Sequence, residues 1–141
     1  MDVTFTLHQS GSLLDYIRIA DSNGKLVVEP KEANINKDTH LITKMNPLVV
    51  IRFGNENCTS AVSSGKNPSW TDVMSFDRTI DEDILIIELW DFNDFGNNDL
   101  LGEGYASITD SLSGIEKNMK KIELSFMDKP IGEIVLTLTF K

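Results

Sequence analysis

Oxygen-bearing side chains crowd together in residues 91–99 (DFNDFGNND), directly after the apolar run of residues 84–90 (ILIIELW). Carboxylates and carboxamides at this density repel one another or stay unsatisfied unless water or a hard cation lies among them. Ca²⁺ takes about six to eight oxygen ligands, so the residue types and their spacing make residues 91–99 a candidate Ca²⁺ site.

The elements that flank this segment distinguish two kinds of Ca²⁺ loop. An EF-hand has oxygen ligands at its first, third and fifth positions, Gly at the sixth and Glu at the twelfth, between two helices. Counted from Asp91, the fifth and twelfth positions are Phe95 and Gly102. Residues 84–90 are short and rich in Ile, Leu and Trp, which is typical of a strand. The EF-hand is therefore rejected, and the loop is expected to follow a β-strand.

The composition indicates one domain with its own hydrophobic core. The chain has 141 residues, 40% of them hydrophobic, and no apolar run approaches the ~20 residues that span a bilayer. The N-terminus has neither the basic start nor the apolar segment of a signal peptide, and a single cysteine, Cys58, excludes an internal disulfide. Both observations favour the cytoplasm as the expected location.

The net charge of -9 limits the possible partners. Nucleic acid and anionic lipid are both repelled by such a surface, and the longest basic cluster is Lys120-Lys121. Nucleic acid is therefore excluded as a partner. Attraction to an anionic membrane requires that the local charge be reversed, and bound divalent cations are the simplest means.

Apolar residues alternate with period two, and turn signals recur about every ten residues, which favours an all-β, antiparallel β-sandwich. The expected strands are residues 25–30, 48–53, 58–62, 70–77, 84–90, 104–108, 121–126 and 133–140. Residues 54–57, 63–68 and 127–132 are expected turns, and residues 111–119 a short helix. Residues 1–23 fit the pattern less well and are expected to form an N-terminal extension packed on the domain of residues 24–141.

Several segments occur in an order shared with one protein family. They are residues 25–35, Asp38 and residues 46–51, then residues 65–70 (GKNPSW) with 74–76 (MSF), Trp90-Asp91 with residues 99–102 (DLLG), and residues 132–140. This order resembles the C2 domain, the membrane-targeting module of protein kinase C and synaptotagmins. The resemblance implies an eight-stranded antiparallel Greek-key sandwich. The good fit of the last strand, and the lack of a convincing extra strand before Lys25, favour the phospholipase-type connectivity.

The resemblance also implies a Ca²⁺ site, because loops at one end of the sandwich hold Ca²⁺ in this family. Carried over by residue, the ligands are Asp38, Asn46, Asp91, Asn93 and Asp99. Asn46 and Asn93 stand where the family has Asp. A carboxamide oxygen is neutral and cannot bind through two oxygens, so Ca²⁺ binding is expected to be weak, about 10⁻⁴ M or poorer. The alternative is a metal-free loop, since Asp and Asn are also common in turns.

Apolar residues in these loops point to a membrane or a partner. Leu41, Ile42 and Phe95 are expected to contact lipid and Lys44 to meet a lipid phosphate, unless the apolar side chains tuck back onto the domain. The basic cluster with which some members bind phosphoinositides is missing, and no catalytic arrangement is found. The sequence therefore predicts a non-enzymatic, Ca²⁺-responsive module that docks on phospholipid membranes. The alternative is a Ca²⁺-independent domain of the same fold that binds a protein.

Overall fold

A computed structural model describes residues 24–36, 44–77, 82–108 and 118–140 of the chain. These residues form eight antiparallel strands and no helix. The strands are β1 (Lys25–Ile35), β2 (Pro47–Phe53), β3 (Glu56–Thr59), β4 (Met74–Asp77), β5 (Ile84–Asp91), β6 (Asp99–Ser107), β7 (Asn118–Phe126) and β8 (Lys129–Phe140). The predicted extension of residues 1–23 lies outside the described residues.

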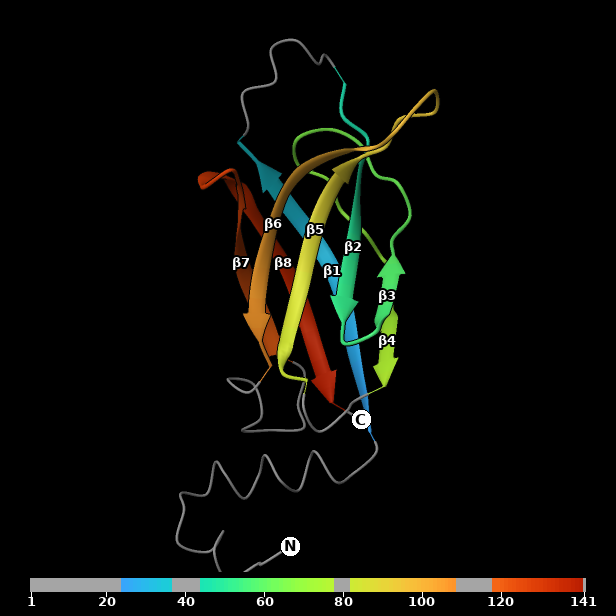
Figure 1. Ribbon diagram of the computed structural model, residues 1–141, viewed down its shortest axis with the longest axis vertical. Helices are drawn as coiled ribbons and strands as arrows, with labels where there is room; N and C mark the ends of the chain where they lie inside the picture. Colours follow the sequence, from blue (N-terminus) through green and yellow to red (C-terminus); the bar gives the residue numbers. More distant parts are fainter. Residues whose placement is uncertain (1–23, 37–43, 78–81, 109–117, 141) are drawn as a thin grey trace, which may run out of the picture.

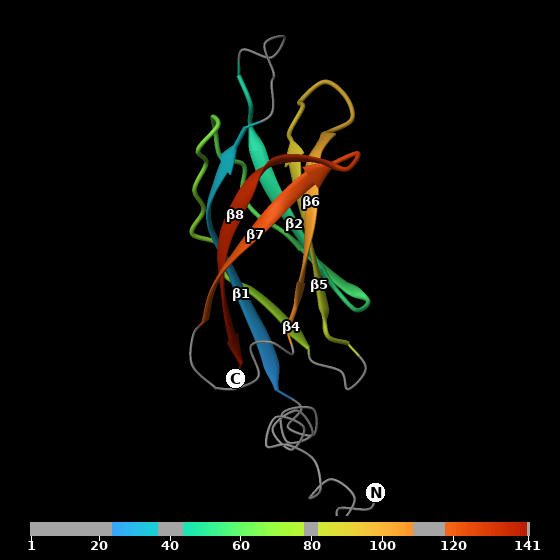
Figure 2. The ribbon, with the colours of Figure 1, turned by 90° about the vertical axis from the view of Figure 1, so that its left-hand side faces the viewer.

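The strands form the two layers of a β-sandwich. Their hydrogen-bonded order is β3-β2-β5-β6-β7-β8-β1-β4, and only one residue pair, Glu103 and Ser125, links β6 to β7. That weak link separates a β3-β2-β5-β6 layer from a β7-β8-β1-β4 layer, as the two side views show (Figures 1 and 2). The predicted all-β sandwich is confirmed. β8 lies between β1 and β7, and the assignment to the phospholipase-type connectivity stays a prediction.

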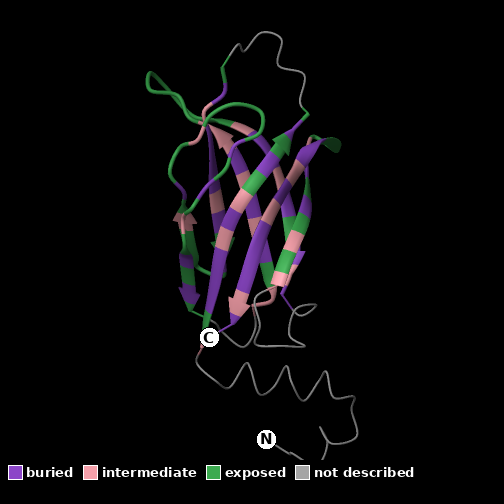
Figure 3. Ribbon diagram, turned by 180° about the vertical axis from the view of Figure 1, so that it is seen from behind, coloured by how far each residue is buried: buried purple, intermediate pink, exposed green. Residues whose placement is uncertain are grey.

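The core lies between the two layers and follows the period of two residues that the sequence predicted. In β8, Ile134, Leu136, Leu138 and Phe140 are all buried, whereas Val135 and Thr139 are only partly covered. Successive side chains of a strand point to opposite faces, so one face of each strand supplies the core. Figure 3 shows this alternation of buried and exposed residues along the strands.

Several predicted boundaries were wrong, and non-local pairing explains the differences. β8 begins at Lys129 rather than 133, because Met127 and Asp128 alone form the turn, with φ angles of 52° and 66°. β6 begins at Asp99 rather than 104, because Asp99 pairs with Asp91. Three other boundaries also differ: β1 continues to Ile35 rather than 30, β4 begins at Met74 rather than 70, and β3 ends at Thr59 rather than 62.

The predicted short helix of residues 111–119 is wrong at its C-terminal end. Asn118 and Met119 belong to β7, where they pair with Leu138 and Thr137 of β8. The rest of that segment lies outside the described residues. Within the described residues, no helix is long and apolar enough to cross a membrane.

Candidate functional site

The candidate ligands come from segments that meet at one end of the sandwich. β1 and β5 end there, and β2 and β6 begin there, as Figures 1 and 2 both show. The loop of residues 92–98 therefore lies at the same end as Asn36 and residues 44–46, which flank the first predicted loop. Asp38 itself lies outside the described residues.

Asn46 and Asp91 are held together across β2 and β5. The backbone N–H of Asn46 donates to Asp91 Oδ1 over 2.8 Å, and the N–H of Phe92 donates to the carbonyl oxygen of Asn46 over 2.9 Å. Pro47 and Asp91 are paired in the ladder, so the first predicted loop enters β2 beside the end of β5. Two candidate ligands that are 45 positions apart in sequence thus lie side by side.

Asp99 adds a second carboxylate at the base of the same loop. Asp91 and Asp99 are partners in the β5–β6 ladder, so their side chains leave the two strands at adjacent positions. Like charges that lie directly opposite each other in a sheet are destabilising. A cation between these carboxylates would remove that repulsion, which is one reason for such a pair to occur at a cation site.

The remaining polar side chains of the loop organise its backbone. Asn93 Oδ1 accepts a hydrogen bond from the N–H of Phe95, and Asn98 Oδ1 accepts one from the N–H of Asn93, each over 3.0 Å. The first of these is the local turn that Asn side chains commonly form. Asn93 therefore has a structural role in the loop, in addition to its predicted role as a ligand.

The donor set fits a hard cation only in part. Asp91 and Asp99 supply charged oxygens, and Asn46 and Asn93 could add only neutral ones. Within residues 24–36, 44–77, 82–108 and 118–140, no group of three or more His, Cys, Asp or Glu side chains could hold a metal ion. The third predicted carboxylate, from Asp38, would be needed to complete the set.

The apolar side chains of the loops differ sharply in exposure. Phe95 is 97% exposed at the tip of the 92–98 loop, and Phe92 is also exposed. Met45, in contrast, is buried in the core. Lys44 is exposed beside it, whereas Leu41 and Ile42 lie outside the described residues. The structure thus places two of the four predicted membrane contacts at this end.

One exposed apolar residue at this end was not predicted from the sequence. Met127 is 82% exposed in the β7–β8 turn, which lies at the same end of the sandwich (Figures 1 and 2). The missed signal is an apolar residue in a two-residue turn, a position where Asn or Gly is usual. Its exposure gives this end a second apolar point besides the 92–98 loop.

The outer face of β2 and β3 carries little positive charge in the described residues. Arg52 is the cation there, and its guanidinium lies 3.2 Å from a carboxylate oxygen of Glu88. A shallow pocket beside it is lined mainly by Leu48, Val50, Thr59 and Trp90. This surface offers a phosphorylated headgroup one arginine that is already ion-paired.

A two-layer antiparallel sandwich with an acidic loop at one end is consistent with the architecture of a C2 domain. The family model for the C2 domain matches residues 24–124, and the chain belongs to this family.

Comparison with known proteins agrees with this assignment. Elicitor-responsive protein 1 of Oryza sativa subsp. japonica is 33% identical in an alignment of 112 residues, and the match covers 70% of this chain and 70% of that protein. A C2 domain of plant Extended Synaptotagmin 1 has a TM-score of 0.71 at 21% identity, over 84% of this chain and 95% of that one, and shows the fold alone. A structure of Extended-Synaptotagmin 2 that contains its SMP domain and C2 domains has a TM-score of 0.66 at 26% identity, over 84% and 27% of the chains.

Proposed function

We propose that this C2 domain binds phospholipid membranes through the loops at one end of its sandwich, and that Ca²⁺ promotes the binding. One observation carries the proposal. Asp91 and Asp99 oppose each other at the base of a loop whose tip exposes Phe95 almost completely. A charged base and an apolar tip suit a loop that must first be neutralised and then enter a membrane.

Electrostatics explain why a cation would act as the switch. The chain carries a net charge of -9, so an anionic bilayer repels it in the absence of metal. Bound Ca²⁺ would supply positive charge between the loops and the lipid phosphates. Its ligands would be Asp38, Asn46, Asp91, Asn93 and Asp99, and the two carboxamides make the expected affinity low.

Apolar contact would provide the rest of the binding energy. Transfer of Phe95 from water into lipid contributes about 1.5–3 kcal/mol at most, because its ring is almost fully exposed in the free domain. Leu41 and Ile42 are proposed to enter beside it, and Lys44 to meet a lipid phosphate. On this proposal the protein is a peripheral membrane-binding module of the cytoplasm and has no catalytic function.

Vesicle sedimentation tests the proposal. The full chain is mixed with phosphatidylcholine vesicles that contain phosphatidylserine, with millimolar Ca²⁺ or with a chelator. The protein is expected to pellet only with Ca²⁺. Asp91→Asn combined with Asp99→Asn should remove the Ca²⁺ effect, whereas Glu123→Gln, an exposed charge removed from β7, should preserve it. Equal pelleting with Ca²⁺ and with chelator would contradict the proposal.

A Ca²⁺-independent protein-binding domain is the second candidate function. It is favoured by the hydrogen bonds that already engage candidate ligands within the chain, from the N–H of Asn46 to Asp91 Oδ1 and from the N–H of Phe95 to Asn93 Oδ1. A ligand that binds only the folded state raises the melting temperature, and the rise increases with ligand concentration. An unchanged melting temperature at millimolar Ca²⁺ would therefore favour this second function.

A further inference from the structure

Strand β5 carries apolar side chains on both of its faces. Leu85, Ile87 and Leu89 point into the core and are fully buried, so Ile84 and Ile86 point to the outer face. A continuous apolar run of this kind is typical of a strand that is covered on both sides. Figure 1 shows β5 and β6 in one layer, and within the described residues no strand or helix lies over their outer surface.

An exposed apolar patch results where β5 meets β6. Ile86 pairs with Tyr105 across the ladder, and Glu88 pairs with Glu103. Tyr105 is 59% exposed and Ile84 is 43% exposed. We refer to Ile84, Ile86, Glu88, Glu103 and Tyr105 together as the β5–β6 face. Apolar groups with an aromatic side chain that has a polar tip are common at the centres of protein interfaces.

The two carboxylates of the β5–β6 face are neutralised unequally. The charge of Glu88 is compensated by Arg52, whose guanidinium lies 3.2 Å from its carboxylate, and the Glu88 side chain is only 14% exposed. Glu88 also accepts a hydrogen bond from Trp90 Nε1 over 3.1 Å. Glu103 accepts one hydrogen bond, from the hydroxyl of Tyr105 over 3.3 Å. Among the described residues, no Lys, Arg or His lies within ion-pair distance of Glu103.

The negative charge of Glu103 acts on the neighbouring Tyr105 hydroxyl. The charge of Glu103 raises the pKa of the Tyr105 hydroxyl above its usual value, with smaller contributions from desolvation, the hydrogen bond and Glu88. Like charges directly opposite each other also weaken a sheet. The face thus combines exposed apolar groups with one carboxylate that lacks a cation among the described residues.

We propose that the β5–β6 face docks a segment of another protein in which Arg or Lys alternates with apolar residues. The cation pairs with Glu103, and the apolar side chains cover Ile84, Ile86 and Tyr105. Charge complementarity selects this partner, because a negatively charged face repels an anionic lipid surface. This proposal does not depend on Ca²⁺ or on the loops.

A second copy of the chain fits this face less well. Two-fold pairing brings the same patch of both copies together. The outer surface of β2, β5 and β6 offers Arg52 as its cation, and Arg52 is already paired with Glu88. Such a dimer would bring two copies of Glu103 near each other without any added positive charge.

A peptide titration of the full chain tests the proposal. The probe is a synthetic peptide that alternates leucine and arginine, and the matched peptide has glutamate in place of each arginine. Backbone amide signals of the ¹⁵N-labelled chain are followed by NMR in the presence of chelator. The arginine peptide is expected to shift the amides of residues 84–88 and 103–105, and the glutamate peptide is not.

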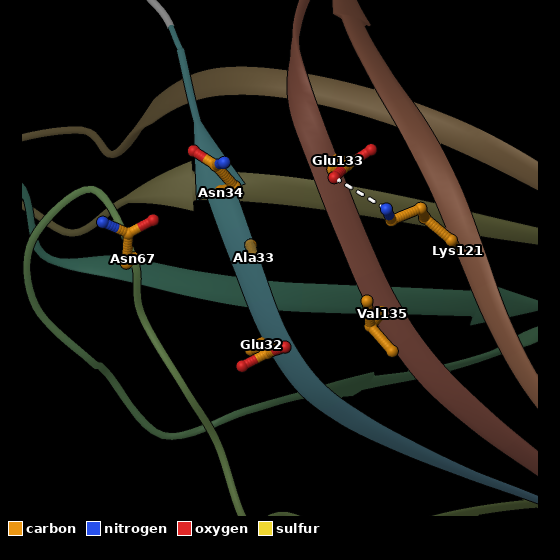
Figure 4. A pocket seen from close by; sticks show the side chains of 7 residues that line it. All are labelled: Glu32, Ala33, Asn34, Asn67, Lys121, Glu133 and Val135. Carbon is orange, nitrogen blue, oxygen red and sulfur yellow. Dashed lines mark ion pairs between the residues drawn. The ribbon is translucent and has the colours of Figure 1, made fainter.

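Two variants locate the charge contact. Glu103→Gln should weaken binding of the arginine peptide by up to about fivefold, the upper end of what one exposed ion pair contributes. Glu123→Gln is the matched control, since Glu123 also lies opposite an ion-paired glutamate. Its partner Glu133 contacts Lys121 at 3.2 Å on the other layer (Figure 4). The control variant should bind the peptide as tightly as the original chain.

Three results would overturn the proposal. The first is equal weakening by both variants, which means that any acidic surface attracts the peptide. The second is that Glu103→Gln and Tyr105→Ser both leave the affinity for the arginine peptide unchanged. Both residues lie on the surface, so neither substitution disturbs the core. The third is a set of nuclear Overhauser contacts between Tyr105 and residues 1–23 in the free chain, because the chain would then cover its own face.

Discussion

Asp91 and Asp99 are direct partners across the β5–β6 ladder, so the base of the 92–98 loop carries two opposed carboxylates. Their opposition costs stability in the absence of a cation and favours cation binding. The same pair therefore connects the stability of the fold with the proposed function. Its two effects have opposite signs, which makes them separable by experiment.

Asp99→Asn is predicted to stabilise the fold in the absence of Ca²⁺ and to make it less stable than the original chain when Ca²⁺ is present. With chelator, the variant should be more stable than the original chain by up to about 1 kcal/mol, because the repulsion is removed. At about 10 mM Ca²⁺, a site with a dissociation constant near 10⁻⁴ M stabilises the original chain by about 2.7 kcal/mol, and the variant loses most of this gain. Urea unfolding under the two conditions measures both values. Asp83→Asn removes a charge at the opposite end and should show no reversal.

Phe95→Ser is predicted to weaken membrane binding without weakening the fold. The ring is 97% exposed in the free domain, so its removal leaves no cavity. Binding to the phosphatidylserine vesicles should fall about tenfold if about 1.5 kcal/mol of apolar transfer is lost. The urea midpoint should not change. Val73→Ser changes another exposed apolar residue, outside the strands, and equal losses for both variants would contradict a specific role for the loop.

The sequence predicted the existence of the strands better than their pairing. Alternating apolar residues mark β8 clearly, because its core face is set by the period of two. The start of β6 at Asp99 was missed, because Asp has a low preference for strands and only its pairing with Asp91 places it in the ladder. A register shift between Leu89 and Trp90 fixes that pairing, and no local pattern indicates such a shift.

The oxygen donors of the candidate site could be recognised in the sequence by their residue types, but the exposure of the loop residues could not be predicted from it. Asp91, Asn93 and Asp99 stand out as oxygen donors in the sequence, and the resemblance to C2 domains added Asn46. Whether a loop residue faces water depends on distant segments. Gly65, for example, donates its N–H to the carbonyl oxygen of Met45 and brings another loop against it. Met45 and Phe95 are both apolar loop residues, yet one is buried and the other is exposed.

Substitution of the β7–β8 turn by residues that tolerate a left-handed backbone is predicted to make the fold more stable. Met127 and Asp128 both have positive φ angles, which cost side chains other than Gly, Asn and Asp about 1 kcal/mol or more. Met127→Asn with Asp128→Gly should raise the free energy of unfolding by about 1 kcal/mol, measured in urea. Asn55→Gly, in the β2–β3 turn, is the control. Asn55 does not have a positive φ, so glycine there should give no gain.

Tyr105 is predicted to report the uncompensated charge of Glu103 through its ionisation. The raised pKa means that the phenol holds its proton more tightly in the folded chain than in the unfolded one. The resulting stability is fully present below a pH of about 10, the ordinary tyrosine pKa, and is lost as the pH rises through the folded-state pKa. Ultraviolet titration measures the shift directly. Tyr16→Phe is used as the background, because Tyr16 is the other tyrosine in the chain.

On that background, Glu103→Gln should move the titration midpoint of Tyr105 down toward its ordinary value and reduce the loss of stability at high pH. Glu88→Gln should move it less, because Glu88 makes the smallest contribution to the shift. Addition of the arginine peptide should also lower the midpoint, since a cation beside Glu103 cancels the charge that opposes ionisation. A midpoint that does not respond to Glu103→Gln would show that the charge of Glu103 does not affect the ionisation of the phenol.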